Sequence, residues 1–190
     1  MIERDPLLLF NQSFDRNKLK GLVIFDRDNT LIVDVPGLRK VEDVSWLPGR
    51  LNCLENLASI GYEIAIATNQ SAIGFGKLSV PDYIQVTSNL VNQLNENNSP
   101  PSMVAACPHE YEKTNRRAIC DCRKPRPGLL DVIISNSSIL PRRVLFVGDS
   151  LSDKEAAISS NYEIDFLYSS KEEMEFTQNI LDWVESGAGS

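Results

Sequence analysis

The chain has little histidine and no long apolar run, and both shortages exclude classes of protein. His109 is the single histidine among 190 residues, so a Ser/His or Cys/His catalytic pair would have to use it. No apolar run approaches the roughly 18 residues that cross a bilayer. The first residues lack the basic start and apolar centre of a secretion signal. We therefore expect a cytoplasmic protein with no membrane partner.

An overall excess of positive charge is also missing. The formal net charge is −7, which argues against duplex nucleic acid as the main partner. Six arginines could still form a local basic patch that binds phosphorylated nucleic-acid ends: Arg116, Arg117, Arg123, Arg126, Arg142 and Arg143. No stripe of stacking aromatic residues accompanies them. The sequence thus favours a small molecule over nucleic acid.

The four cysteines are unevenly placed. Cys53 stands alone in a helical pattern and is predicted to be a packed side chain. The other three lie with His109 in the segment 107–122, as Cys107, Cys120 and Cys122. Three thiolates and an imidazole complete a tetrahedral zinc site with no position left for water, which is typical of structural zinc. The alternative is a loop of free thiols. A disulfide between Cys120 and Cys122 is disfavoured, since the short loop between them would strain it.

Apolar patterning predicts alternating strands and helices. Strands are predicted at 22–25, 62–67, 103–106, 144–147 and 164–168, and helices at 48–61, from 79, from 127, at 151–160 and from 170. Residues 31–35 are predicted to be extended, and Ser79 and Ser170 to cap the helices that follow them. Residues 1–19 read as an irregular N-terminal extension. The alternation predicts one α/β domain at 20–186, a doubly wound parallel sheet with helices on both faces.

Polar residues that can carry chemistry follow these strands. Asp26 and Asp28 follow the first strand, Thr68 and Asn69 the second, and Asp149 the fourth. In a parallel sheet such strand ends line one edge. Two carboxylates as close as Asp26 and Asp28 are costly to keep ionised without a cation. Taken alone, that pair could also be a polar exit from a strand; taken together, the residues predict phosphoryl transfer.

Four segments resemble the motifs of the haloacid dehalogenase superfamily of phosphatases. They are Asp26-Arg27-Asp28-Asn29-Thr30, Thr68-Asn69-Gln70-Ser71, Arg123-Lys124-Pro125 and Gly148-Asp149-Ser150-Leu151-Ser152-Asp153. The resemblance covers residues 20–160. It implies a magnesium-dependent phosphomonoesterase that works through an aspartyl phosphate, on a Rossmann-like core with a minimal cap.

The resemblance also implies roles for individual residues. Asp26 would be the nucleophile and Asp28 the general acid/base. Thr68 would hydrogen-bond the phosphoryl group, Asn69 would bind substrate beside it, and Lys124 would neutralise charge.

A magnesium ion would be held in this scheme by Asp26, by Asp28 through its main-chain carbonyl, and by Asp149. Asp153 has two readings that can coexist, because it can support the metal site and can also form a capping box with Ser150.

The cysteine pattern running into Arg123 and Lys124 resembles one branch of the superfamily, the heptose bisphosphate and histidinol-phosphate phosphatases. In that branch a zinc loop orders the arginine and lysine that follow it. The branch implies D-glycero-D-manno-heptose 1,7-bisphosphate, losing its 7-phosphate, as the substrate, with histidinol phosphate as the alternative. Arg123 would then contact the second phosphate; its other reading is a solvated arginine.

Three positions depart from the pattern of that branch. Asn29 replaces a usual glycine, Phe75 stands where an arginine is common, and Ser150 replaces a frequent lysine. Asparagine tolerates unusual backbone angles, whereas two missing positive charges favour a less anionic substrate. A non-catalytic, zinc-ordered binding module is the alternative from another class. We expect a monomer.

Overall fold

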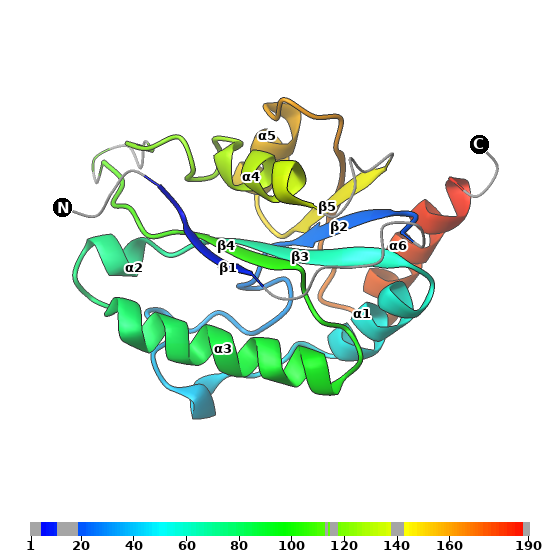
Figure 1. Cartoon of the computed structure of the whole chain (residues 1–190), viewed down its shortest axis with the longest axis horizontal. Coiled ribbons are helices and arrows are strands. Elements are labelled where there is room, and N and C mark those ends of the chain that lie inside the picture. The colour runs from blue at the N-terminus through cyan, green and yellow to red at the C-terminus, as the bar shows by residue number, and fades with distance from the viewer. Residues whose placement is uncertain (1–4, 11–18, 113, 115–117, 138–142, 188–190) are drawn as a thin grey trace.

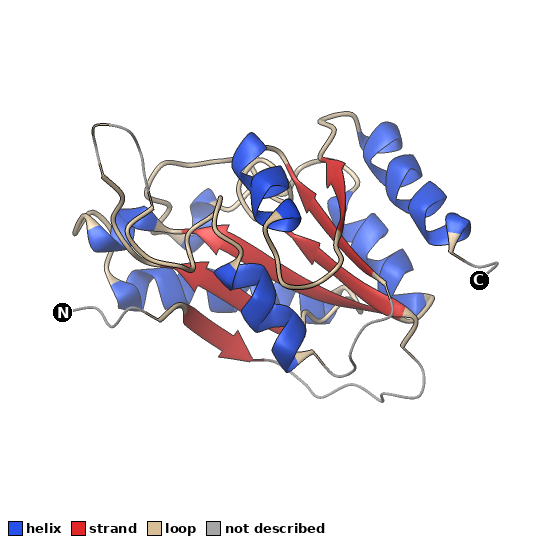
Figure 2. Cartoon of the chain, turned by 90° about the horizontal axis from the view of Figure 1, so that it is seen from above, coloured by secondary structure: helices blue, strands red, loops and turns tan. Residues whose placement is uncertain are grey.

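A central mixed sheet with helices on both faces forms the molecule (Figures 1 and 2). The computed structural model describes residues 5–10, 19–112, 114, 118–137 and 143–187. The strands are β1 (Leu7–Phe10), β2 (Gly21–Phe25), β3 (Tyr62–Asn69), β4 (Met103–Cys107), β5 (Val144–Gly148) and β6 (Asp165–Tyr168). The helices are η2 (Val41–Asp43), α1 (Arg50–Ser59), α2 (Ser71–Gly74), α3 (Val80–Glu96), α4 (Gly128–Asn136), α5 (Leu151–Ile158) and α6 (Glu173–Ser186).

The strand order is β1-β4-β3-β2-β5-β6, and all neighbours are parallel except β1 and β4. The predicted α/β fold is therefore confirmed, with one antiparallel edge strand added. β1 falls inside the predicted irregular extension, which is a correction: Leu7 pairs with Ala106 and Phe10 with Met103. Leu7 and Leu9 pack on one side of the sheet and Leu8 on the other. A strand that is apolar on both faces shows no alternation.

One further prediction of local structure is wrong: Ser170 is not the N-cap of α6, which is Glu172. The segment 31–35 belongs to no named strand, and Ile32 makes isolated bridges to Asp28 and Trp46. The predicted cap of α3 is confirmed, since the Ser79 hydroxyl accepts a hydrogen bond from the amide of Asp82 at 3.1 Å.

The core lies on both faces of the sheet, and β2 is buried between its two parts. Val23 and Phe25 pack with side chains of α1, α3 and α6, whereas Leu22 and Ile24 pack with those of α4 and α5. Figure 1 shows α4 and α5 above the sheet and α1 and α3 below it. Each such side chain stabilises the fold by about 1.5–3 kcal/mol. The residues that follow β2 are thus anchored by a fully buried strand.

Cys53 is buried in the lower part of the core, as predicted for a packed side chain. Burial raises the pKa of its thiol to about 11, so the thiol stays protonated at neutral pH.

A buried arginine ties two loops at the carboxyl edge of the sheet together. Arg50 donates hydrogen bonds to the carbonyls of Thr30, Pro48 and Ser170, and its guanidinium lies 3.7 Å from the ring centre of Phe176. Thr30 follows β2 and Ser170 follows β6, so Arg50 connects the loops that leave these two strands. Among the described helices, none is long and apolar enough to cross a membrane.

Candidate active site and metal cluster

A cavity of about 230 Å³ lies at the carboxyl edge of the parallel strands. Its lining residues are Asp26, Asp28, Asn29, Asp34, Asn69, Lys124, Asp149, Ser150, Ser152 and Asp153. The structure therefore brings together residues from all four motif segments. Thr68 and Arg123 are described residues that lie outside this lining.

Asp26 and Lys124 form a buried ion pair at the centre of the site. The amide of Asp26 donates to the carbonyl of Val147 and continues the ladder between β2 and β5. Lys124 Nζ lies 2.6 Å from Asp26 Oδ1 and 2.7 Å from Asp153 Oδ1, and it donates to the carbonyl of Ala67 at 2.9 Å. One ammonium thus holds two carboxylates beside the end of β3.

The electrostatic balance of this pair is dominated by burial. Burial raises the pKa of Asp26 to about 7, against the opposing effect of Lys124 and with added repulsion from Asp153 and Asp28. Burial alone lowers the pKa of Lys124, but the neighbouring carboxylates outweigh it and raise that pKa. The site therefore holds more negative charge than one lysine compensates.

Three carboxylates can hold a cation here. Oxygens of Asp26, Asp149 and Asp153 lie within 4.8 Å of one another. Burial and the charge of Asp153 also raise the pKa of Asp149. Carboxylate oxygens are the ligands that Mg²⁺ prefers, so the uncompensated acids fit a divalent cation.

Asp153 uses its two oxygens differently, and its predicted capping box with Ser150 is confirmed. Oδ2 accepts from the amide of Ser150 at 3.0 Å, and the amide of Asp153 donates to Ser150 Oγ at 3.3 Å, which completes a capping box. Oδ1 faces Lys124. Gly148 makes room for this arrangement, because a Cβ there would lie 2.6 Å from Asp153 Cγ.

Asp28 is held by Thr68 and by two side chains for which the sequence suggested no role, Arg27 and Gln70. Arg27 donates to both oxygens of Asp28 at 2.9–3.0 Å. Gln70 Nε2 donates to Asp28 Oδ2 at 2.9 Å and to Thr68 Oγ1 at 2.8 Å, and the Thr68 hydroxyl lies 3.3 Å from the same carboxylate. Arg27, Thr68 and Gln70 are all buried. Their place inside two motif segments was the available signal, but side-chain direction beyond a strand end is not readable from sequence.

The main chain at Lys124 is fixed by Asn69. Asn69 Nδ2 donates to the Lys124 carbonyl at 3.0 Å, and the Lys124 amide donates to Asn69 Oδ1 at 3.1 Å. Asn69 therefore positions Lys124 while also lining the cavity. Asn29 has φ 57°, the left-handed conformation that asparagine tolerates in place of glycine.

The cysteine cluster is compact and buried. Cys107 Sγ lies 3.4 Å from His109 Nδ1 and 3.5 Å from Cys120 Sγ, Cys122 Sγ lies 3.5 Å from Cys120 Sγ, and His109 Nδ1 lies 3.1 Å from Cys122 Sγ. All four ligand atoms lie within 4.8 Å of one another, and three thiolates with one imidazole are a donor set of tetrahedral structural zinc. All four cysteines of the chain are free. The cluster therefore has the size and donor set of a closed zinc site.

The thiols of this cluster influence one another. A hydrogen bond with Cys122 lowers the pKa of Cys107 to about 5, against the effect of burial. The same contact raises the pKa of Cys122. One thiolate is thus already favoured, and thiolate is the form that binds metal.

The described arginines do not gather into one basic patch. Arg143 donates to the carbonyl of Trp183 on α6 and stacks on its ring at 4.1 Å, whereas Arg126 pairs with Asp121. Arg123 is half-buried, with its guanidinium 4.5 Å from the ring centre of Tyr111, so it is not a freely solvated arginine. The remaining members, Arg116, Arg117 and Arg142, lie outside the described residues.

Comparisons with known proteins agree with this site. The family model described as polynucleotide kinase 3 phosphatase matches residues 21–180. The chain belongs to this phosphatase family. Two of the curated proteins that this chain resembles are named D-glycero-beta-D-manno-heptose-1,7-bisphosphate 7-phosphatase. The protein from Haemophilus influenzae is 31% identical over 76% of this chain and 79% of its own length. That from Escherichia coli K12 is 28% identical over 85% and 86%.

Solved structures extend the comparison. The D,D-heptose 1,7-bisphosphate phosphatase of B. bronchiseptica, complexed with magnesium and phosphate, matches with TM-score 0.65 and 27% identity over 73% of this chain and 75% of that one. A HAD-like phosphatase from Mesorhizobium loti matches with TM-score 0.76 and 22% identity over 98% and 96%, which shows the shared fold. The predicted resemblance to the haloacid dehalogenase superfamily is confirmed. The chain is therefore a phosphatase, as its family and its named relatives are.

Proposed function

We propose that the protein is a magnesium-dependent phosphomonoesterase that removes the 7-phosphate of D-glycero-D-manno-heptose 1,7-bisphosphate. The observation that carries the proposal is the buried Asp26–Lys124 pair, whose lysine comes two residues after Cys122, the last member of the cysteine and histidine cluster. The relatives named for this heptose phosphatase activity support the choice of substrate. We expect the enzyme to act on this soluble sugar phosphate as a monomer in the cytoplasm.

The reaction has two steps. A carboxylate oxygen of Asp26 attacks phosphorus, the bond from phosphorus to the sugar oxygen breaks, and Asp28 gives that oxygen its proton. Water then attacks phosphorus in the aspartyl phosphate and loses a proton to Asp28, which releases inorganic phosphate and restores Asp26. Lys124 stabilises charge on the transferred group. The Thr68 hydroxyl, which donates to Asp28 in this structure, would turn to hydrogen-bond the transferred phosphoryl group. Asn69 would bind the substrate next to it.

Asp26, Asp149 and the main-chain carbonyl of Asp28 would hold Mg²⁺, with Asp153 next to them. The ion supplies positive charge for the phosphate and the carboxylates. Support comes from the raised pKa values of Asp26 and Asp149 and from the B. bronchiseptica phosphatase solved with magnesium.

Zinc held by Cys107, His109, Cys120 and Cys122 would have a structural role. Because Arg123 and Lys124 come directly after Cys122, closing the cluster around zinc would fix the main chain that presents both side chains. Arg123 would contact the second phosphate.

A 3′-phosphorylated nucleic-acid end is the second candidate, because of the description of the family model. The net charge of −7 and the dispersed positions of Arg126 and Arg143 argue against it. Histidinol phosphate remains the alternative small substrate.

The test is phosphate release with four substrates: the heptose bisphosphate, histidinol phosphate, a 3′-phosphorylated oligonucleotide and p-nitrophenyl phosphate. We expect the highest kcat/KM for the heptose bisphosphate. Asp26→Asn should lower kcat at least about 10³-fold. Asp34→Asn is the matched control, because Asp34 lines the same cavity without an assigned role.

A higher kcat/KM for another substrate would replace the proposed one. Equal rates for Asp26→Asn and wild type would remove the nucleophile. No release from any substrate by protein that holds both metals would identify a binding module instead.

A further inference from the structure

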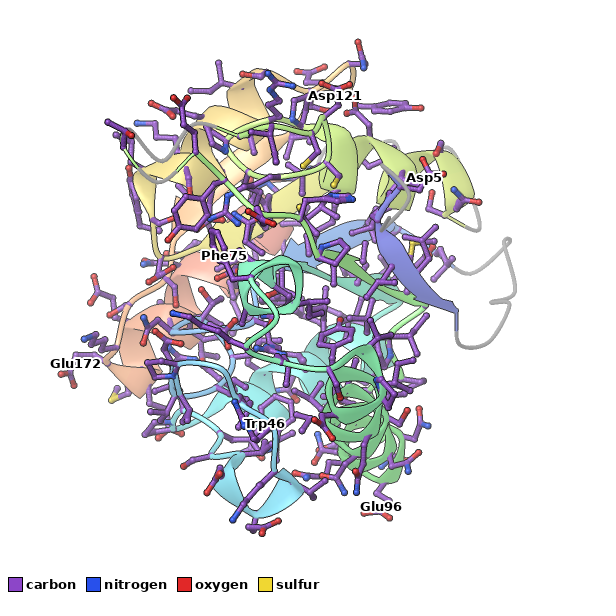
Figure 3. All side chains as sticks on the ribbon, turned by 90° about the vertical axis from the view of Figure 1, so that its left-hand side faces the viewer. Asp5, Trp46, Phe75, Glu96, Asp121 and Glu172 are labelled. Atoms are coloured by element: carbon purple, nitrogen blue, oxygen red, sulfur yellow. The ribbon has the colours of Figure 1, made fainter. Side chains whose placement is uncertain are left out.

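Three side chains from separate segments pack together, and one of them, Arg123, is the chain neighbour of Lys124, which lines the cavity. The rings of Phe75 and Tyr111 meet edge to face, with centroids 5.0 Å apart and planes at 90°. The guanidinium carbon of Arg123 lies 4.5 Å from the centroid of the Tyr111 ring. Figure 3 shows Phe75 next to α2. Tyr111 is thus contacted both by a ring edge and by a cation.

The cysteine cluster fixes two members of this group. Tyr111 comes two residues after His109 and forms an isolated antiparallel bridge with Ala118. Arg123 follows Cys122 directly. Any metal that closes the cluster therefore also fixes the main chain at both Tyr111 and Arg123.

Close packing of α2 fixes the third member. A Cβ on Gly74 would lie 2.5 Å from the amide nitrogen of Glu110 and 2.8 Å from the carbonyl oxygen of Pro108. Only glycine permits this approach of α2 to the cysteine-containing loop. Phe75 follows Gly74, so its ring is brought against Tyr111 by contacts between main chains.

Arg123 has a hydrogen-bond donor that no described residue uses. Lys124 is committed to Asp26 and Asp153, and Arg27 to Asp28. In contrast, Arg123 Nη1 is buried and has no hydrogen-bond partner among the described residues. A guanidinium stacked on a ring keeps its N–H groups in its own plane, where they can bind an oxyanion. Arg123 also adjoins Lys124, which lines the cavity.

We propose that Tyr111, braced by Phe75, is a positioning residue that holds Arg123 for the anionic group a substrate carries beyond the transferred phosphate. This inference rests on the proposed function, because it concerns the same site. It also gives Phe75 a role: its ring supports the stack instead of supplying a positive charge. With one guanidinium so placed, the site favours a substrate with one further phosphate over a monophosphate.

The test compares the heptose 1,7-bisphosphate with the heptose 7-phosphate, which lacks the second phosphate. The measured quantity is the ratio of their kcat/KM values. Tyr111→Ala should lower this ratio roughly tenfold, mainly through the KM of the bisphosphate. Tyr111→Phe keeps the ring and should stay within about twofold of wild type. Phe75→Leu should lower the ratio roughly threefold.

Arg123→Ala should lower the ratio as much as Tyr111→Ala does, and the double variant should lower it no further, because both changes remove one interaction. Tyr168→Ala is the matched control. It removes another edge-to-face pair, with Phe166 at 4.9 Å, from outside the proposed group, and should leave the ratio unchanged. Zinc content and the thermal midpoint verify that each variant is folded.

Equal slowing of both substrates by Tyr111→Ala, or additive effects of Tyr111→Ala and Arg123→Ala, would overturn the proposal. If Tyr111→Ala fails to fold, Phe75→Leu carries the same comparison. If wild type releases phosphate from neither sugar, the proposed function fails. The Kd ratio for the same two sugars, measured on Asp26→Asn with and without Tyr111→Ala, then decides the positioning role without turnover: an unchanged ratio refutes it.

Discussion

The catalytic cavity draws its side chains from strand ends far apart in the chain, whereas the cysteine cluster takes all four from residues 107–122. The first arrangement exists only when the whole sheet is folded, because β2, β3 and β5 must lie in register. The second needs one loop and a metal that accepts thiolates. The two regions meet at Cys122, Arg123 and Lys124. Under the proposed function, the sheet would place the acids, and the cluster, once closed around zinc, would place Arg123 and Lys124.

Breaking the cluster should have the largest effect on this comparison. Cys122→Ser should remove zinc and lower kcat/KM roughly hundredfold, because the main chain before Lys124 loses its anchor. Metal analysis and phosphate release measure the two effects. Cys53→Ser is the matched control: that thiol is equally buried but far from the cluster, so zinc and activity should remain. Loss of zinc with full activity would show that the two regions are independent.

A smaller effect is expected from a change inside the catalytic cavity alone. Gln70→Ala should lower kcat roughly tenfold on alkyl phosphates, because Asp28 loses a hydrogen bond that orients it as proton donor. On p-nitrophenyl phosphate, whose leaving group needs no proton, kcat should change much less. Gln178→Ala on the exposed face of α6 is the control. An equal loss on both esters would mean that Gln70 does not act through Asp28.

The smallest predicted effect concerns the charge of Asp26 in the catalytic cavity and how it changes the stabilisation by magnesium with pH. Burial raises the pKa of Asp26 from 3.8 to about 7. Between these values the folded protein keeps a proton that the unfolded chain has lost, so metal-free stability falls as pH rises through this window. Magnesium must displace that proton at pH 5.5 but not at pH 8. Its increase in the thermal midpoint should therefore be roughly 4 °C larger at pH 8, and Asp26→Asn should reduce this difference to the part that comes from Asp149.

Features encoded locally were predictable from the sequence. The apolar run of β2, the acids after it and the set of Cys107, His109, Cys120 and Cys122 each lie within a short segment whose period or chemistry is distinctive. The convergence of strand ends then follows from the parallel sheet.

Features that depend on non-local packing were not predictable. Residues 7–10 are a short apolar run like that of β2, but their antiparallel pairing with the open edge of β4 depends on the folded sheet and is not visible in the run itself. The contacts of Arg27 and Gln70 with Asp28 depend on side-chain directions beyond a strand end. The stack of Phe75, Tyr111 and Arg123 joins loops without any period.

The most direct test of the account is to capture the covalent intermediate. Asp28→Asn should slow the second step most with p-nitrophenyl phosphate, because the first step then needs no proton donor while water still lacks its base. Acid-quenched protein analysed by mass spectrometry should carry a phosphoryl group on the peptide that contains Asp26, and the Asp26→Asn protein should carry none. Release of p-nitrophenol with no phosphorylated peptide, or phosphorylation at another residue, would contradict the account.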